Sequence, residues 1–122
     1  MSGFSRLLME HFSSPRNQGA MESPDHIGLV GTPGNGPFML LCLRMEGNRV
    51  VGAKFQTYGC GASIASGSML TQMIAGLSVE ECLALAAEDL TEALGGVPPH
   101  KLHCPAMAIG ALRNALRSFV SG

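Results

Sequence analysis

The hydrophobic period of the sequence changes at Cys60, and this change restricts the folds open to the chain. Between residues 27 and 57 the apolar residues alternate or run continuously, as they do in β-strands. After Cys60 they recur every three or four residues, as they do in helices. With a further helical pattern near the N-terminus, this order predicts an α+β fold, in which helices pack on a three-stranded antiparallel sheet.

Three segments carry the strand pattern, and we predict a sheet from Ile27–Val30, Phe38–Met45 and Val50–Thr57. The second segment is apolar on both faces, which is typical of a central strand covered on both sides. The pair Gly47-Asn48 is typical of a hairpin turn between the second and third strands. The third strand alternates, so we expect one set of its side chains to face the core: Val51, Ala53 and Phe55.

Helical patterns lie on both sides of these strands. They predict helices over Ser2–Phe12, Ala62–Ala75, Ser78–Ala87 and Glu88–Leu94. Ser78 and Glu81 have the spacing of a capping box, and Gly95-Gly96 is typical of a helix end. We expect a last helix with Pro105 at its first position, where proline costs no hydrogen bond. Its apolar stripe is Ile109, Leu112, Leu116 and Phe119.

Composition limits the classes of protein to which the chain can belong. With 122 residues, 46% of them hydrophobic, residues 1–122 suit a single folded domain. The net charge is −1 and the basic residues are not clustered, which argues against nucleic acid or an anionic membrane as partner. No apolar run approaches a membrane span of about 18 residues, and Met1–Phe12 has no signal-peptide core. We therefore expect a cytoplasmic protein with reduced thiols.

The four cysteines fall into two groups. Cys42 lies in a predicted strand and Cys82 on an apolar helix face, so we interpret both as core residues. Cys60 and Cys104 each lie where a helix is predicted to begin, near unpaired N–H groups and the positive end of the helix dipole. This context favours the thiolate, which binds metals and attacks sulfur. We expect a lowered pKa for Cys104 in particular, because His103 precedes it.

A metal or sulfur site can be built from these residues. Thiolates with the imidazole of His103 suit iron–sulfur clusters or zinc. Gly59 and Gly61 flank Cys60 and would leave room for a cluster or a partner's loop. Two cysteines without a CxxC pair are, however, also typical of small buried residues. Spacing alone therefore fits both a metal or sulfur role and a structural role.

Several segments, in order along nearly the whole chain, resemble the IscU/NifU-type iron–sulfur cluster scaffold family. Residues 11–19 (HFSSPRNQG) resemble its HxxxPRNxG segment, and Gly28–Gly31 resembles the start of its first strand. Residues 53–61 (AKFQTYGCG) differ at one position from its AKFKTYGCG signature. Residues 98–104 (PPHKLHC) resemble its PPVKIHC segment, where a dedicated Hsp70-type chaperone binds bacterial members. Here His100 replaces the valine of that segment.

This resemblance implies an IscU/SufU-like sandwich that holds a nascent [2Fe–2S] cluster, iron or zinc. In the family three cysteines and an aspartate are ligands, a cysteine desulfurase delivers sulfur, and apo-proteins accept the cluster. Cys60 and Cys104 match the second and third cysteines, and His103 matches a nearby histidine. The first cysteine and the aspartate are replaced by Asn35 and Pro37, so two ligands of the family set are missing.

Three functions fit this damaged site. The first is an iron–sulfur scaffold or carrier with weakened assembly, in which a homodimer supplies Cys60 and Cys104 twice. The second is a regulatory relative that docks on the desulfurase without assembling clusters. The third is a zinc-dependent sulfurtransferase with Cys60, His103 and Cys104 as ligands. We expect a binding protein rather than an enzyme, with the three residues meeting at one end of the fold, near the loop at residues 34–37.

Overall fold

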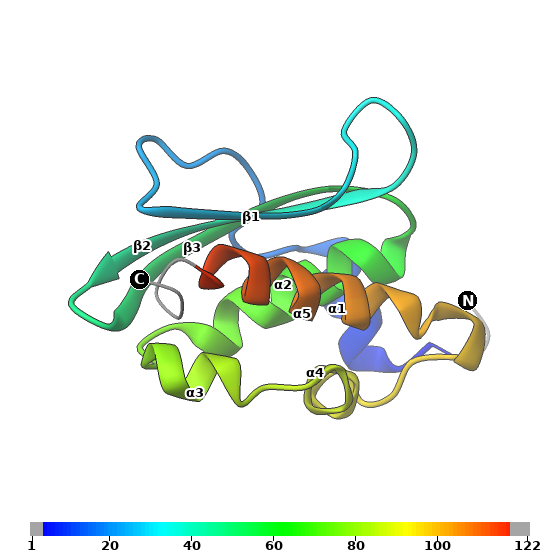
Figure 1. The fold of residues 1–122 in the computed structure, drawn as a ribbon. Helices are drawn as coiled ribbons and strands as arrows, with labels where there is room; N and C mark the ends of the chain where they lie inside the picture. The colour runs from blue at the N-terminus through cyan, green and yellow to red at the C-terminus, as the bar shows by residue number, and fades with distance from the viewer. Residues whose placement is uncertain (1–3, 118–122) are drawn as a thin grey trace.

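The chain folds into two layers, a three-stranded antiparallel sheet and a layer of helices on one of its faces (Figure 1). The structure is a computed structural model that describes residues 4–117. The strands are β1 (His26–Gly31), β2 (Phe38–Glu46) and β3 (Arg49–Tyr58), and the sheet order is β1-β2-β3. The predicted α+β class, the antiparallel sheet and the central place of the second strand are confirmed. No helix among residues 4–117 is long and apolar enough to cross a membrane.

The register of the sheet places its two faces in different surroundings. Leu41 pairs with Gly28 on one side and Phe55 on the other, and this face meets the helices. Cys42, on the opposite face, is also buried, whereas its neighbour Leu40 is half-buried. The second strand was predicted to be covered on both faces. It is fully covered on the face toward the helices and only partly covered on the other face.

A β-bulge overturns the predicted alternation of the third strand. Arg44 pairs with Gly52 but Met45 pairs with Val50, so Val51 is an extra residue opposite β2. Val50 is fully buried while Val51 is 54% exposed. The prediction that Val51 faces the core is wrong, because an extra residue in one strand turns the following side chains to the other face. Phe55, beyond the bulge, is buried as expected.

The first helix, α1 (Arg6–Ser13), is shorter than predicted. Ser5 is its N-cap, and the Ser5 hydroxyl accepts a hydrogen bond from the Leu8 N–H at 2.9 Å. The predicted start is therefore too early, because a serine side chain that caps the helix ends it at that point. Ser2 itself lies outside the described residues.

Residues after α1 attach it to the rest of the fold. Ser68 Oγ lies 2.7 Å from His11 Nδ1 and accepts the Arg16 N–H at 2.8 Å. The chain then runs beside β3, where the Phe55 N–H donates to Asn17 O at 3.0 Å and the Phe55 carbonyl oxygen accepts the Gly19 N–H at 2.8 Å. The HxxxPRNxG-like segment thus holds α1 in place and covers the free edge of β3.

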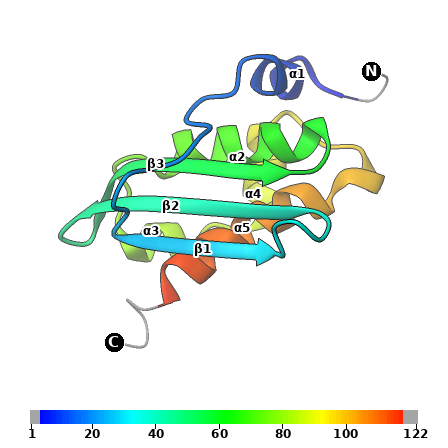
Figure 2. The same ribbon diagram turned by 90° about the horizontal axis from the view of Figure 1, so that it is seen from above.

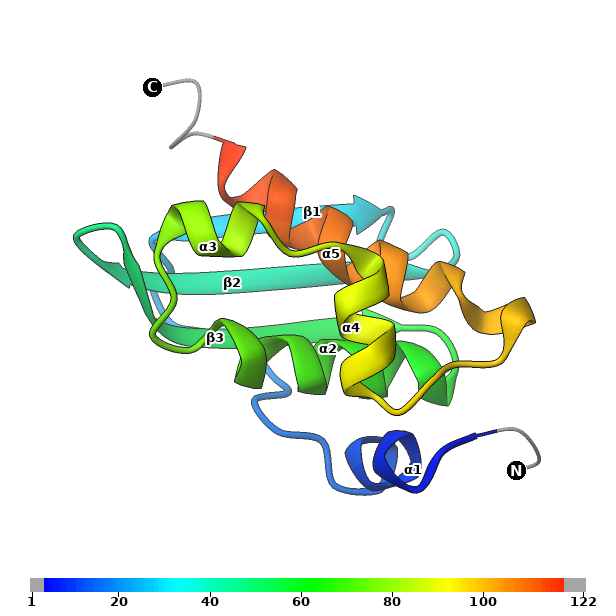
Figure 3. The ribbon, with the colours of Figure 1, turned by 90° about the horizontal axis from the view of Figure 1, so that it is seen from below.

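Four further helices form the second layer: α2 (Gly61–Ile74), α3 (Val79–Leu83), α4 (Ala87–Ala93) and α5 (His103–Ala115). Figure 3 shows α2 and α5 side by side against the sheet, with α1 on the outer side of α2. The predicted capping box is present, with Ser78 and Glu81 bonded reciprocally. The helix that it opens ends at Leu83 rather than Ala87, because Asp89 Oδ2 accepts the Ala86 N–H at 2.8 Å and starts a new helix.

The last helix begins at His103, two residues before Pro105, so the prediction that Pro105 is its first residue is wrong. Pro105 still lies in the first turn, where an N–H would have no intrahelical acceptor. A 3₁₀ turn over Pro99–Lys101 precedes it. The predicted stripe is buried at Ile109, Leu112 and Leu116, and Phe119 lies outside the described residues.

β1 and α5 touch through a glycine. A Cβ atom at Gly28 would lie 1.9 Å from the Ala111 carbonyl oxygen and 2.5 Å from the Ala115 nitrogen. The first turn of α5 lies at the same end of the sheet as the end of β3 and the start of α2 (Figure 2). The loop between β1 and β2 is at that end too. Three segments distant in sequence therefore lie at this end: the β1–β2 loop, the junction of β3 with α2, and the start of α5.

Candidate functional site

Cys60 is the N-cap residue of α2, separated from the end of β3 by Gly59 alone. Its backbone is extended, with φ −89° and ψ 177°, and its carbonyl oxygen accepts the Ser63 N–H at 3.0 Å. The predicted helix-start position is confirmed, and the side chain is half-buried.

The glycines beside Cys60 serve packing within the chain. A Cβ at Gly61 would lie 2.9 Å from the Phe12 ring, and one at Gly59 would lie 2.9 Å from Ser63 Oγ. The space predicted to admit a cluster or a partner's loop is thus occupied, on these sides, by the chain's own side chains. A larger residue at either position would require Phe12 or Ser63 to move.

Cys104 lies in the first turn of α5 and is fully buried. Its Sγ lies 3.6 Å from Cys60 Sγ, so two thiols 44 residues apart in sequence are in contact. Two sulfur ligands on one tetrahedral zinc ion, each at about 2.3 Å, lie about 3.8 Å apart. The pair is therefore spaced as two ligands of one metal ion would be.

His103 approaches one of these thiols from the surface. Its Nε2 lies 3.5 Å from Cys104 Sγ, and the residue is exposed. Within residues 4–117, no group of three or more His, Cys, Asp or Glu side chains is arranged to hold a metal ion. The structure thus brings Cys60 and Cys104 together and places His103 beside the second thiol, while its role as a third ligand stays a prediction.

Ser63 belongs to the site although it is not among the predicted site residues. Its hydroxyl is buried, donates to Cys104 Sγ at 3.3 Å and lies 4.0 Å from Cys60 Sγ. One feature of the sequence could have identified Ser63: it lies three residues after Cys60 at the start of a predicted helix, and residues with this spacing share one face of the helix. Spacing alone cannot show that a thiol from another helix lies there as well.

The two thiols differ in acidity. Burial favours a neutral Cys60, but the backbone N–H groups of Ser63 and Ala62 and the Cys104 thiol donate to its sulfur and lower its pKa to about 7. Burial is also the main cause at Cys104, whose pKa is raised to about 11 with the charge of Cys60 contributing. The prediction of a lowered pKa for Cys104 is wrong, because its helix start is buried and already faces one thiolate.

The loop between β1 and β2 lies at this end, as predicted. Asn35 and Pro37 are both exposed, and the Asn35 N–H donates to Thr32 O at 3.0 Å. A cavity of about 240 Å³ is lined by Gly34, Gly36, Phe38 and Tyr58, two residues before Cys60. Asn35 therefore lies in a loop that borders the segment carrying Cys60.

The other two cysteines agree with their interpretation as core residues. Cys42 is 7% exposed and Cys82 fully buried, and burial raises the pKa of both thiols, that of Cys82 to about 11. His100 is exposed on the 3₁₀ turn. His26 is half-buried as the first residue of β1.

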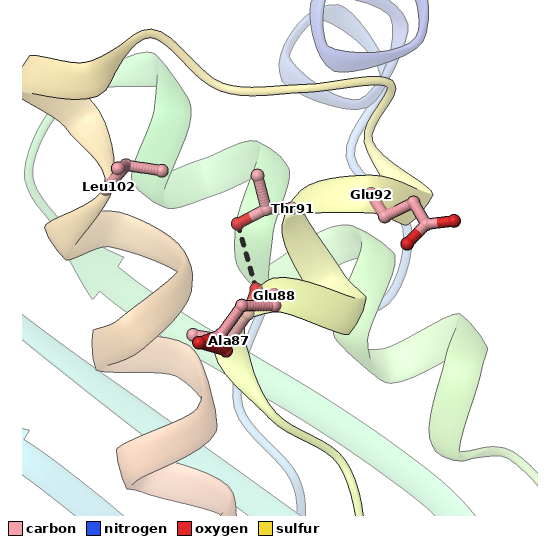
Figure 4. A pocket seen from close by; sticks show the side chains of 5 residues that line it. All are labelled: Ala87, Glu88, Thr91, Glu92 and Leu102. Atoms are coloured by element: carbon pink, nitrogen blue, oxygen red, sulfur yellow. Dashed lines mark hydrogen bonds between the residues drawn. The ribbon is translucent and has the colours of Figure 1, made fainter.

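A second cavity, of about 310 Å³, lies between α4 and the residue that precedes α5 (Figure 4). It is lined by Ala87, Glu88, Thr91, Glu92 and Leu102. The Thr91 hydroxyl donates to Ala87 O at 2.8 Å, and the Glu92 side chain points away from Leu102. None of the predicted site residues lines it, although Leu102 is next to His103 in sequence.

Comparison with known proteins gives consistent matches along the chain. The NifU-like N-terminal domain family matches residues 4–121. The iron–sulfur cluster assembly scaffold protein IscU 1 of Archaeoglobus fulgidus is 42% identical over 113 residues, covering 93% of this chain and 74% of the relative. IscU of Escherichia coli is 34% identical over 122 residues, covering 97% and 94%.

Solved structures share the fold at lower sequence identity. A putative SUF-system scaffold protein from Fervidobacterium islandicum superposes with a TM-score of 0.74 at 20% identity, covering 93% of this chain and 96% of that one. An N-terminal NifU-like protein from Brucella abortus has a TM-score of 0.71 at 17% identity, covering 96% and 94%. These likenesses concern the arrangement of the sheet and helices.

Proposed function

Because this chain belongs to the NifU/IscU family of iron–sulfur cluster assembly scaffolds, we propose that it holds iron or a [2Fe–2S] cluster as cargo at Cys60 and Cys104. A cysteine desulfurase is the partner that supplies sulfur, and apo-proteins are the acceptors. The contact between the two thiols, 3.6 Å apart, is the observation that carries the proposal. Sulfur is the ligand that iron–sulfur chemistry prefers.

The acidity of the pair supports binding near neutral pH. A thiol must lose its proton to become a ligand, so metal affinity depends on how readily it ionises. The pKa of Cys60, lowered to about 7, provides one sulfur anion without metal. Cys104 ionises when a cation replaces its proton, and the Ser63 hydroxyl that donates to its sulfur stabilises that anion.

The site of one chain is incomplete for a cluster. A [2Fe–2S] cluster needs four ligands, and each chain contributes two thiols that are in contact. Two copies supply the four, with one cluster shared between them. A single chain, with Asn35 and Pro37 in place of two anionic ligands, binds more weakly, and His103 beside Cys104 is the nearest additional nitrogen.

Zinc is the second candidate cargo, because the thiol separation also suits two ligands of a tetrahedral ion. With His103 as third ligand and an open position, zinc would prepare the site for sulfur transfer. A [2Fe–2S] cluster absorbs visible light whereas Zn²⁺, with its filled d shell, does not, so an absorbance spectrum and a metal analysis of one preparation distinguish them.

The test is anaerobic reconstitution with Fe²⁺ and sulfide, compared between wild type, Cys60→Ala, Cys104→Ala and the buried control Cys82→Ala. We expect wild type and Cys82→Ala to bind iron and sulfide with one [2Fe–2S] cluster for two chains, visible by absorbance, and both site variants to lose it. Stoichiometric zinc in the purified protein with no cluster would support the sulfurtransferase instead. Equal iron in wild type and Cys60→Ala would refute the proposed site.

A further inference from the structure

The two thiols of the site are in contact but differ in access to solvent. Cys60 is half-buried at the start of α2, whereas Cys104 is fully buried behind it. A reagent from solution can therefore reach the first sulfur, and the second sulfur is 3.6 Å further in. This arrangement suits a pair of attacking and resolving thiols. The outer thiol, Cys60, meets the reagent, and the inner thiol, Cys104, can attack only a sulfur that is already bound to Cys60.

We propose that Cys60 and Cys104 act together as a dithiol that releases sulfide from a bound persulfide. Cys60 captures the outer, sulfane sulfur of a persulfide, and Cys104 then displaces it as sulfide by closing a Cys60–Cys104 disulfide. This inference deepens the proposed function, since it states how sulfur at the same site becomes the sulfide that a cluster needs.

The steps balance in atoms and electrons. First, the Cys60 sulfur attacks the outer sulfur of a donor persulfide, so Cys60 becomes a persulfide and the donor leaves as a thiol. Then the Cys104 sulfur attacks the inner sulfur of that persulfide; one S–S bond forms, the other breaks, and hydrosulfide leaves. The two electrons that reduce the sulfane sulfur come from the two thiols, and the Cys104 proton is lost to water or the leaving group. A dithiol reductant restores the pair.

The contacts of Cys104 favour this direction of attack. Its sulfur touches Cys60 Sγ, while the Ser63 hydroxyl, 3.3 Å away, holds it toward α2. The other cysteines belong to different parts of the fold: Cys42 is in the middle of β2, and Cys82 is in α3, at the opposite end of the sheet from the start of α2 (Figure 3). Cys104 is therefore the thiol placed to resolve a persulfide on Cys60.

The experiment uses metal-free, reduced full-length chain mixed with an equimolar amount of cysteine persulfide, without iron or reductant. Samples are trapped with a thiol-alkylating agent, released sulfide is measured, and peptides are mapped by mass spectrometry. Wild type should release close to one sulfide per chain and yield a peptide pair joined through Cys60 and Cys104. The variant Cys104→Ala should keep the added sulfur on Cys60 and release sulfide at least about tenfold more slowly, because it lacks the adjacent thiol.

Two further variants test whether slower sulfide release from Cys104→Ala has a cause other than loss of the Cys104 thiol, such as misfolding. Cys104→Ser keeps the size of the side chain and should behave as Cys104→Ala does, with circular dichroism confirming that both are folded. Cys82→Ala, which removes an equally buried thiol, should behave as wild type does. A persulfide that persists on wild-type Cys60, or sulfide release at the wild-type rate from folded Cys104→Ser, overturns the inference. Because no metal is present, this result is separate from failure of cluster binding.

Discussion

Cys60 should be the thiol that reacts first at neutral pH, although Cys104 is its direct neighbour. With a pKa of about 7, half of Cys60 is thiolate at pH 7, whereas a pKa of about 11 leaves about one Cys104 in 10⁴ ionised. The more basic thiolate is the better nucleophile, by about 60-fold for a pKa difference of about four with a Brønsted slope near 0.45. The net advantage of Cys60 is therefore about 10²-fold, before the burial of Cys104 adds to it.

The assay is alkylation of the native, reduced protein by iodoacetamide between pH 5 and 9, with each cysteine quantified by peptide mass spectrometry. Because the pKa of Cys60 is lowered, its rate should fall about tenfold for each pH unit below 7 and level off above about 8. Removing the donor thiol in Cys104→Ala should move this midpoint upward, since one hydrogen bond to the thiolate is lost. The variant Cys82→Ala should leave it unchanged.

Two outcomes would refute this reasoning. One is a Cys60 profile with its midpoint near 8.5, the ordinary value of a free thiol, which would mean that the helix-start N–H groups do not outweigh burial. The other is alkylation of Cys104 at neutral pH as fast as Cys60, which would mean that the buried thiol is accessible in solution.

Three other changes test the loop and the packing. Asn35→Cys with Pro37→Asp should tighten iron binding and slow its loss to a chelator, with Asn35→Cys alone giving most of the gain because it supplies the softer ligand. Gly28→Ala should lower the free energy of unfolding in urea by about 3 kcal/mol, because its Cβ would collide with the α5 backbone. Ser68→Ala should cost about 1–3 kcal/mol in the same assay, since the His11 ring and the Arg16 N–H both lose their partner.

Each of these changes has a matched control. Thr32→Cys adds a thiol to the same exposed loop and should not tighten iron binding as Asn35→Cys does. Gly52→Ala is expected to be mild, because its Cβ would meet Arg44 Cβ at an ordinary 3.4 Å. Ser13→Ala alters an exposed serine at the end of α1 and should leave stability nearly unchanged. Any control that matches its test variant would contradict the corresponding explanation.

Local chemistry in the sequence was enough to predict the fold class and most element boundaries. The change of period at Cys60 separates sheet from helices, Gly47 takes the positive φ of +62° that its turn requires, and Ser78 with Glu81 forms the capping box. These features act over a few residues, so their outcome does not depend on the rest of the chain. The segments that resemble the family were sufficient, for the same reason, to select Cys60, His103 and Cys104.

Tertiary packing determines the strand pairing, the burial and the acidity of individual residues. The bulge at Val51 depends on how β3 pairs with β2, and the different pKa values of Cys60 and Cys104 depend on which helix start is buried. Both thiols lie at a helix start, and the local argument from His103 selected the wrong one as the more acidic. Their 3.6 Å contact, and the Ser63 hydroxyl beside them, exist only because α2 and α5 pack together. Burial and contact between distant segments are properties of the assembled fold, and they set the different acidities of the two thiols.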